Sequence, residues 1–156
     1  MLWVSCTLGW VLLALTLIDW RDGILPDVFT LPLIPAGVVI AYLQDPSRVL
    51  ACVAGALAGF ATFETIRRFY RVLRGNEGLG LGDVKLMAAA GALVSYRGLP
   101  SVMLVSAITG LIAILIIAIT KGRVAFEARQ PFGPALCCGI WLVWLYGPVG
   151  LIGPYV

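Results

Sequence analysis

Long apolar runs, separated by short polar segments, occupy almost the whole chain. The runs cover residues 2–18, 28–43, 49–66, 83–95, 99–120 and 135–151. A helix that crosses the hydrocarbon core of a bilayer needs about 20 mostly apolar residues. The pattern therefore predicts an all-α integral membrane protein with a bundle of six transmembrane helices.

Three of these runs carry further signals. The run over residues 2–18 contains no charge and ends at Asp19, and it lacks the basic start and cleavage site of a signal peptide, so we expect a retained helix. Pro32 and Pro35 lie early in the second run, where a helix tolerates proline. Gly55 and Gly59 form a G-x-x-x-G pattern in the third, which predicts a close helix contact.

Composition supports the membrane assignment. The chain is 61% hydrophobic and 12% charged, with a mean hydropathy of +1.01, whereas ordinary soluble domains are about 25% charged. The connections between runs are too short for a second folded unit, so we expect a single membrane domain over residues 1–156.

The cysteine pattern argues against a metal site. The four cysteines all lie within apolar runs, without a C-x-x-C pair, and the chain has no histidine; they are Cys6, Cys52, Cys137 and Cys138. A zinc site needs Cys or His ligands at suitable spacing. We therefore expect no metal and no disulfide framework, and interpret the cysteines as buried free thiols.

Most of the positive charge lies in alternate loops. The loops after the first, third and fifth runs hold nine of the eleven basic residues, namely Arg21, Arg67, Arg68, Arg71, Arg74, Lys85, Lys121, Arg123 and Arg129. The other two, Arg48 and Arg97, follow the second and fourth runs. Because basic loops stay cytoplasmic, we expect the N- and C-termini on the periplasmic side. Asp19 and Asp83 then share the cytoplasmic edge of the membrane.

The stretch before the fourth run contains ionisable residues and spaced glycines. Gly78, Gly80 and Gly82 lie between Glu77 and Asp83. A charged side chain within a membrane helix costs about 2.5 to 3.5 kcal/mol on insertion scales, so a functional role is the default interpretation. Glycine permits positive φ and close approach of another chain. We expect these glycines to leave the backbone beside Asp83 open to an extended peptide.

Asp19 and Asp83 lie at the same expected depth. Two carboxylates that meet in a poorly hydrated site share a proton, and one then acts as base on water while the other acts as acid on a carbonyl. This chemistry needs no metal and no histidine. The residues alone also allow a plainer interpretation, in which Asp19 marks the membrane boundary and Asp83 pairs with Lys85 or a nearby arginine.

Three motifs resemble those of the type IV prepilin peptidase family. Residues 80–83 match the GxGD motif of intramembrane-type aspartyl proteases, and the longer stretch 77–93 resembles the prepilin peptidases. Residues 19–27 resemble the stretch around the first catalytic aspartate of that family, and residues 131–134 resemble its last motif. The three motifs occur in the family's order over nearly the whole chain.

The resemblance implies an aspartic endopeptidase in the bacterial inner (cytoplasmic) membrane. It would remove the short basic leader of type IV prepilins or type II secretion pseudopilins, cutting after a glycine at the cytoplasmic face, with Asp19 and Asp83 as catalytic residues. Water would attack the peptide carbonyl without a covalent enzyme intermediate. The expected partners are these substrates and the lipid bilayer, with no nucleic acid; the residues do not indicate an oligomeric state.

Fuller members of the family carry an additional N-terminal cytoplasmic region, often with a four-cysteine zinc site, that is associated with N-methylation. Here the first apolar run begins at residue 2 and no such cysteines are present. We therefore expect a short form without methyltransferase activity and without a cofactor, S-adenosylmethionine included.

Several residues near the motifs are secondary candidates. Gly80 and Gly82 are assigned to the backbone of the active site, and the candidates for substrate binding or tuning are Glu77, Lys85, Asp22, Pro131, Phe132 and Gly133. Glu77 binds the basic leader or pairs with an arginine of its own loop. Lys85 lowers the pKa of a dyad carboxyl or extends to the interface. Asp27 is a candidate N-cap of the second helix.

Two other classes of protein share this hydropathy. A non-catalytic membrane assembly subunit would not require both aspartates, and a small transporter would use Asp19 and Asp83 to carry protons or cations.

Overall fold

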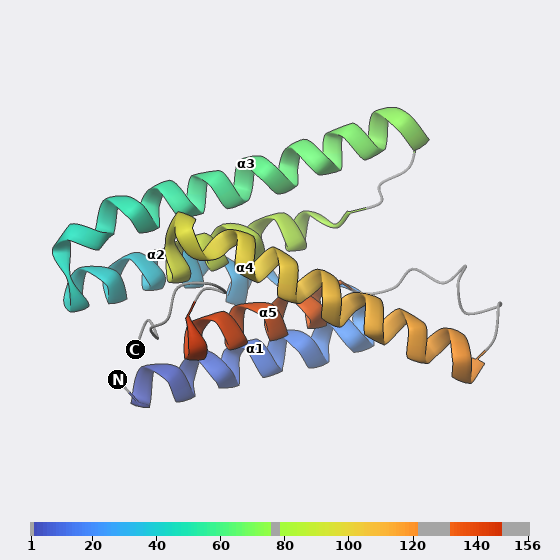
Figure 1. Ribbon diagram of the computed structural model, residues 1–156, viewed down its shortest axis with the longest axis horizontal. Helices are drawn as coiled ribbons and strands as arrows, with labels where there is room; N and C mark the ends of the chain where they lie inside the picture. Colours follow the sequence, from blue (N-terminus) through green and yellow to red (C-terminus); the bar gives the residue numbers. More distant parts are fainter. Residues whose placement is uncertain (1, 76–78, 122–131, 148–156) are drawn as a thin grey trace.

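A computed structural model describes residues 2–75, 79–121 and 132–147. In this part of the chain the secondary structure is entirely helical (Figure 1). The elements are α1 (Leu2–Asp22), α2 (Asp27–Gln44), the 3-10 turn η1 (Pro46–Arg48), α3 (Val49–Arg74), α4 (Leu81–Lys121) and α5 (Gly133–Tyr146).

Four helical segments are long and apolar enough to cross a membrane. They are Leu2–Asp22, Asp27–Gln44, Pro46–Leu73 and Leu81–Thr120, while Gly133–Tyr146 is apolar but shorter. The expected class, an all-helical chain with several membrane-length apolar helices, is confirmed. The count differs from the prediction, because the fourth and fifth runs form the single element α4 and the described residues contain five α-helices.

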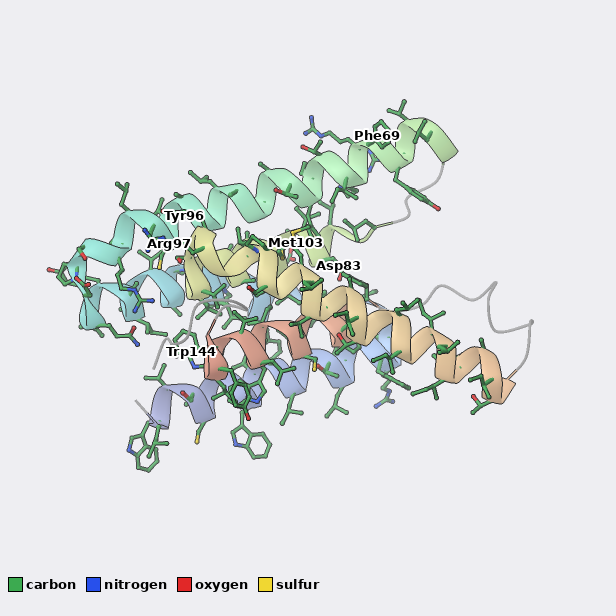
Figure 2. The ribbon with its side chains drawn as sticks, viewed as in Figure 1. Phe69, Asp83, Tyr96, Arg97, Met103 and Trp144 are labelled. Carbon is green, nitrogen blue, oxygen red and sulfur yellow. The ribbon has the colours of Figure 1, made fainter. Side chains whose placement is uncertain are left out.

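Helix α4 is interrupted at Ser95, where the sequence predicts the end of the fourth span. Ser95 has φ 58° and ψ 174°, which is not helical. A straight helix of 41 residues would extend about 60 Å, but the chain turns back at this point. Figure 2 shows Tyr96 and Arg97 toward the left, with Asp83 and Met103 both to their right. We call residues 81–94 the first limb and residues 96–121 the second limb.

The first limb packs against α3 through glycine contacts. A Cβ placed on Gly55 would collide with the carbonyl oxygen of Gly91, and one on Gly59 would lie 2.5 Å from that of Met87. The predicted close contact at the G-x-x-x-G pattern is confirmed. Both contacts step by four residues in opposite chain directions, so α3 and the first limb are antiparallel.

Helix α2 runs parallel to the first limb. A Cβ on Gly37 would lie 2.8 Å from the carbonyl carbon of Ala92, and Lys85 lies beside Asp27 near the start of each helix. One contact joins residues near the start of both helices, and the other joins residues further along both. The two helices therefore run in the same direction. The first turn of α4, which contains Asp83, therefore lies at the same end of the molecule as the start of α2.

Helix α5 lies between α1 and the second limb (Figure 1). The indole Nε1 of Trp144 donates a hydrogen bond of 3.1 Å to the Ser5 hydroxyl of α1. On the other side, a Cβ on Gly139 would lie 2.9 Å from the carbonyl oxygen of Val102. At the other end of α5, Gly133 meets Asp19 of α1 and Ala135 lies 3.5 Å from the position of a Cβ on Gly110 of the second limb. Helix α5 is therefore antiparallel to both neighbours and begins where α1 ends.

Burial is greatest along the first limb. Seven of its apolar side chains have no or almost no exposed surface: Val84, Leu86, Met87, Ala89, Ala90, Ala92 and Val94. Large apolar side chains on α1, α3 and the second limb are exposed, as suits lipid-facing surfaces, among them Trp10, Leu57 and Leu111. The first limb is thus the central helix, and it carries Asp83 in its first turn.

The cysteine interpretation needs one correction. All four cysteines are free, and Cys52 and Cys137 are buried as expected, but Cys6 and Cys138 are exposed. The reason is that an apolar run is no evidence of burial in a membrane protein, where lipid accepts a small hydrophobic thiol as readily as the core does.

Candidate functional site

Asp19 is buried at the end of α1, beside the start of α5. The residue is 5% exposed. A Cβ on Gly133 would lie 2.8 Å from its Cγ and would overlap its Oδ2. Only glycine leaves room for the carboxyl group at this position. The first residue of α5 therefore rests on Asp19, and the positive end of the α5 dipole favours an ionised carboxylate there.

Asp83 is buried in the first turn of α4. It is 8% exposed, and its Oδ2 would lie 3.4 Å from a Cβ on Gly80. A carboxylate in the first turn of a helix is stabilised by the helix dipole.

Helix α5 lies near both aspartates. Cys137, four residues after Gly133, is buried in α5 near both Asp19 and Asp83. Asp19 and Asp83 are therefore in one neighbourhood, although they are separated by 64 positions in the sequence. In Figure 2 Asp83 lies inside the bundle, toward the end at which α1 ends and α5 begins.

The glycines before Asp83 have different surroundings. Neither Gly80 nor Gly82 has a positive φ, and Gly78 lies outside the described residues. Gly82 is required for close packing, because its Cβ would lie 2.6 Å from the Cβ of Leu25. The expectation that these glycines leave the backbone open to an extended peptide stays a prediction.

Lys85 forms an ion pair that the sequence did not reveal. Its Nζ lies 2.7 Å from both carboxylate oxygens of Asp27. Asp27 is the first residue of α2, and the N-cap position is Pro26, which makes no side-chain cap hydrogen bond. The N-cap interpretation of Asp27 is therefore wrong, because its carboxylate turns to the neighbouring lysine.

The remaining candidates are spread around the site. Asp22 is exposed at the last residue of α1. Phe132 precedes α5, is half-buried and lies 3.4 Å from the position of a Cβ on Gly110. Glu77 and Pro131 lie outside the described residues. Of the 131–134 motif, Gly133 is the member that contacts an aspartate.

Sequence reasoning also missed a charged cluster on α3. Glu64 accepts hydrogen bonds from Arg67 Nε at 2.9 Å and Arg67 Nη2 at 3.1 Å, and from Arg68 Nε at 2.7 Å. The spacings of three and four residues between a carboxylate and a cation indicated such pairs. Nothing in the sequence indicated that Arg67 is buried.

Comparison with known proteins gives a consistent picture. Residues 6–115 match the model of the type IV leader peptidase family. This segment includes both aspartates and ends before Gly133. The chain is 42% identical over 128 residues to a prepilin leader peptidase/N-methyltransferase of Burkholderia pseudomallei, covering 82% of this chain and 41% of that protein.

Two further relatives differ in how much of their length is matched. A prepilin leader peptidase/N-methyltransferase of Aeromonas salmonicida is 38% identical over 90% of this chain and 48% of its own length. The leader peptidase HopD of Escherichia coli is 36% identical over 80% of this chain and 81% of its own length. The chain thus spans about half or less of the first two proteins and most of the third. No solved structure shows significant similarity to it.

Proposed function

Since the chain belongs to the type IV leader peptidase family, we propose that it is an aspartic endopeptidase that removes the leader of type IV prepilins or type II secretion pseudopilins. Asp19 and Asp83 are the proposed catalytic pair. The observation that supports the proposal is that two buried carboxyl groups from distant parts of the chain, Asp19 beside Gly133 and Asp83 in the first turn of α4, both lie near Cys137 of α5.

The proposed reaction uses one proton shared by the two carboxyl groups. The ionised aspartate takes a proton from water, the resulting hydroxide attacks the scissile carbonyl, and the protonated aspartate gives its proton to the carbonyl oxygen. As the tetrahedral intermediate collapses, one of its hydroxyl groups gives its proton to the ionised aspartate, the C–N bond breaks, and the leaving amine takes the proton of the other aspartate, so that the dyad again holds one proton. Asp83 lies in the first turn of α4, and Asp19, at the end of α1, lies against the first residue of α5; the N-termini of α4 and α5 favour the negative charge that the dyad must carry.

The proposed substrate is a prepilin whose leader ends with a glycine and is bound in an extended conformation. Glycine resists helix formation, so it exposes a peptide bond that a helix would shield. Gly80 leaves space beside the Asp83 carboxyl group, where a Cβ would already be in van der Waals contact. Asp22 is exposed at this end of the molecule and is a candidate for the basic residues of the leader, as is Glu77.

We also propose six membrane crossings, with both termini periplasmic. The two limbs of α4 would cross separately, since the chain turns back at Ser95 (Figure 1). The connections after α1 and α3 then face the cytoplasm together with most of the basic residues. The same assignment puts the proposed dyad on the side from which a basic leader is cut, in the inner membrane.

The decisive experiment measures cleavage of a prepilin in membranes that contain the wild type, Asp19→Asn or Asp83→Asn. Asparagine preserves shape but cannot share the proton, so each variant should lose about 10²- to 10⁴-fold in rate. Asp45→Asn is the matched control, because Asp45 is exposed and caps η1 through the Ser47 N–H at 2.9 Å, a role that asparagine keeps.

Variant abundance is measured alongside the rate. Full processing by either dyad variant at normal abundance would contradict the assignment. A transporter or a non-catalytic assembly subunit would release no leader even as wild type.

A further inference from the structure

Arg67 is a buried cation at the level where α3 approaches the cytoplasmic end. The Arg67 side chain is 10% exposed and that of Glu64 is 13% exposed, whereas that of Arg68 is 75% exposed. Glu64 holds the Arg67 guanidinium with both carboxylate oxygens. A two-point contact of this kind fixes the orientation of the guanidinium as well as its position.

The packing register directs Arg67 toward Asp83. Gly55 meets Gly91 and Gly59 meets Met87, so each step of four along α3 matches a step of four back along α4. Continuing this register places residue 63 at the level of Asp83, and Arg67 one helical turn further along α3, beyond the first residue of α4 at Leu81. Phe63 is buried in the same face.

The direction of the Arg67 side chain along α3 brings its guanidinium closer to the level of Asp83. The Cα–Cβ bonds of a helix tilt toward its N-terminus, so a long side chain covers the preceding turn. The Arg67 side chain therefore extends back along α3 toward the level of Asp83. The contact of its guanidinium with Glu64, three residues earlier in α3, agrees with this direction.

Each helix around Asp83 contributes different ionisable groups. Helix α1 contributes Asp19, and α5 contributes the thiol of Cys137. Lys85 of α4 is bound to Asp27 of α2. From α3, the cluster of Glu64, Arg67 and Arg68 carries a net positive charge, and its buried cation is Arg67.

We propose that Arg67, oriented by Glu64, is a positioning residue that keeps the Asp19–Asp83 dyad singly ionised at working pH. The inference rests on the proposed function of the two aspartates. A nearby cation favours the ionised form of a carboxyl group, and a poorly hydrated site strengthens that effect. Arg67 thereby offsets the cost of one negative charge in a buried pair.

The sign of the effect can be tested through the pH dependence of cleavage. The dyad is active with one proton, so activity falls on the acid side as a second proton binds and on the alkaline side as the last one leaves. A cation lowers the pKa of both steps. Arg67→Gln should therefore move both limbs of the profile, and the optimum, upward by about one pH unit.

Three matched variants separate charge from packing. Glu64→Gln removes a negative charge from the same cluster and should move the optimum downward. Arg67→Lys keeps the charge and should keep the optimum. Arg68→Gln makes the same charge change as Arg67→Gln at a solvent-screened position, and should leave the optimum within a few tenths of a pH unit.

An unchanged optimum for Arg67→Gln, with cleavage reduced equally at all pH values, would overturn the inference and assign Arg67 to packing alone. If Arg67→Gln does not accumulate, Glu64→Gln decides, and an unshifted optimum there overturns the inference equally. The proposed function fails separately, through full cleavage by Asp19→Asn or Asp83→Asn in the same assay.

Discussion

Gly133 shows how one missing side chain shapes the site. The position that a Cβ would occupy lies 2.8 Å from Cγ of Asp19, so α5 and the carboxyl group approach as closely as the backbone permits. The resemblance of residues 131–134 to a family motif marked Gly133 as a candidate, but did not say what it contacts.

Gly133→Ala should reduce prepilin cleavage by about 10²-fold, because displacement of a catalytic group by about 1 Å costs that much. Gly110→Ala is the control: it makes the same change in a helix near α5, with the nearest atom of Phe132 at 3.4 Å, and should retain cleavage. Rates are measured at matched abundance. Equal activity of both variants would contradict the role of close packing at Asp19.

At the scale of one helix, the non-helical conformation of Ser95 divides α4 into its two limbs. Its φ of 58° and ψ of 174° fall in a region that is nearly restricted to glycine and that costs about 1 to 3 kcal/mol for other residues. The side chain is buried at the turn, so the surrounding packing holds the conformation.

Ser95→Gly should raise thermal stability in detergent micelles, by about 1 kcal/mol once the greater freedom of glycine in the unfolded chain is subtracted. Ser106→Gly is the comparison, since Ser106 is also buried but lies within the second limb. There glycine should cost about 0.5 kcal/mol, which is the difference in helix propensity between serine and glycine. A fall in melting temperature for both variants would show that Ser95 is not strained.

The ends of the helices do not always coincide with the ends of the apolar runs. Helix α3 continues to Arg74 although its apolar run ends at residue 66. Hydropathy reports the length in contact with lipid, whereas backbone hydrogen bonding continues into the polar segment. The break at Ser95, by contrast, coincides with the end of an apolar run.

At the scale of the whole molecule, the first limb packs against α2 and α3, and the connections after α1 and α3 lie at its Asp83 end (Figure 1). The proposed orientation puts this end in the cytoplasm. It therefore makes a prediction about which connections are reached from each side.

In a chain whose native cysteines are replaced by serine, a membrane-impermeant maleimide should label Ser47→Cys in cells with a permeabilised outer membrane, and should not label Ile24→Cys. Both positions are exposed, one between α2 and α3 and the other between α1 and α2. Inverted inner-membrane vesicles should give the opposite pattern. Labelling of Ile24→Cys from the periplasmic side would reverse the proposed topology.

The sequence by itself determined the helical membrane class, the approximate extent of each apolar segment and the two aspartates worth testing. It did so because the cost of placing charge and open backbone in hydrocarbon leaves few alternatives. It also indicated the contact at Gly55 and Gly59, since small residues at that spacing permit close backbone approach.

Only the tertiary structure decided which side chains meet. The contact of Gly133 with Asp19, the pair of Lys85 with Asp27 and the burial of Arg67 all depend on helix register. Register is hidden in such a sequence because lipid is as apolar as the protein core, so hydropathy does not distinguish the face toward a neighbouring helix from the face toward lipid. Packing of small residues made that choice, and thereby placed the Asp19 carboxyl group against the first residue of α5.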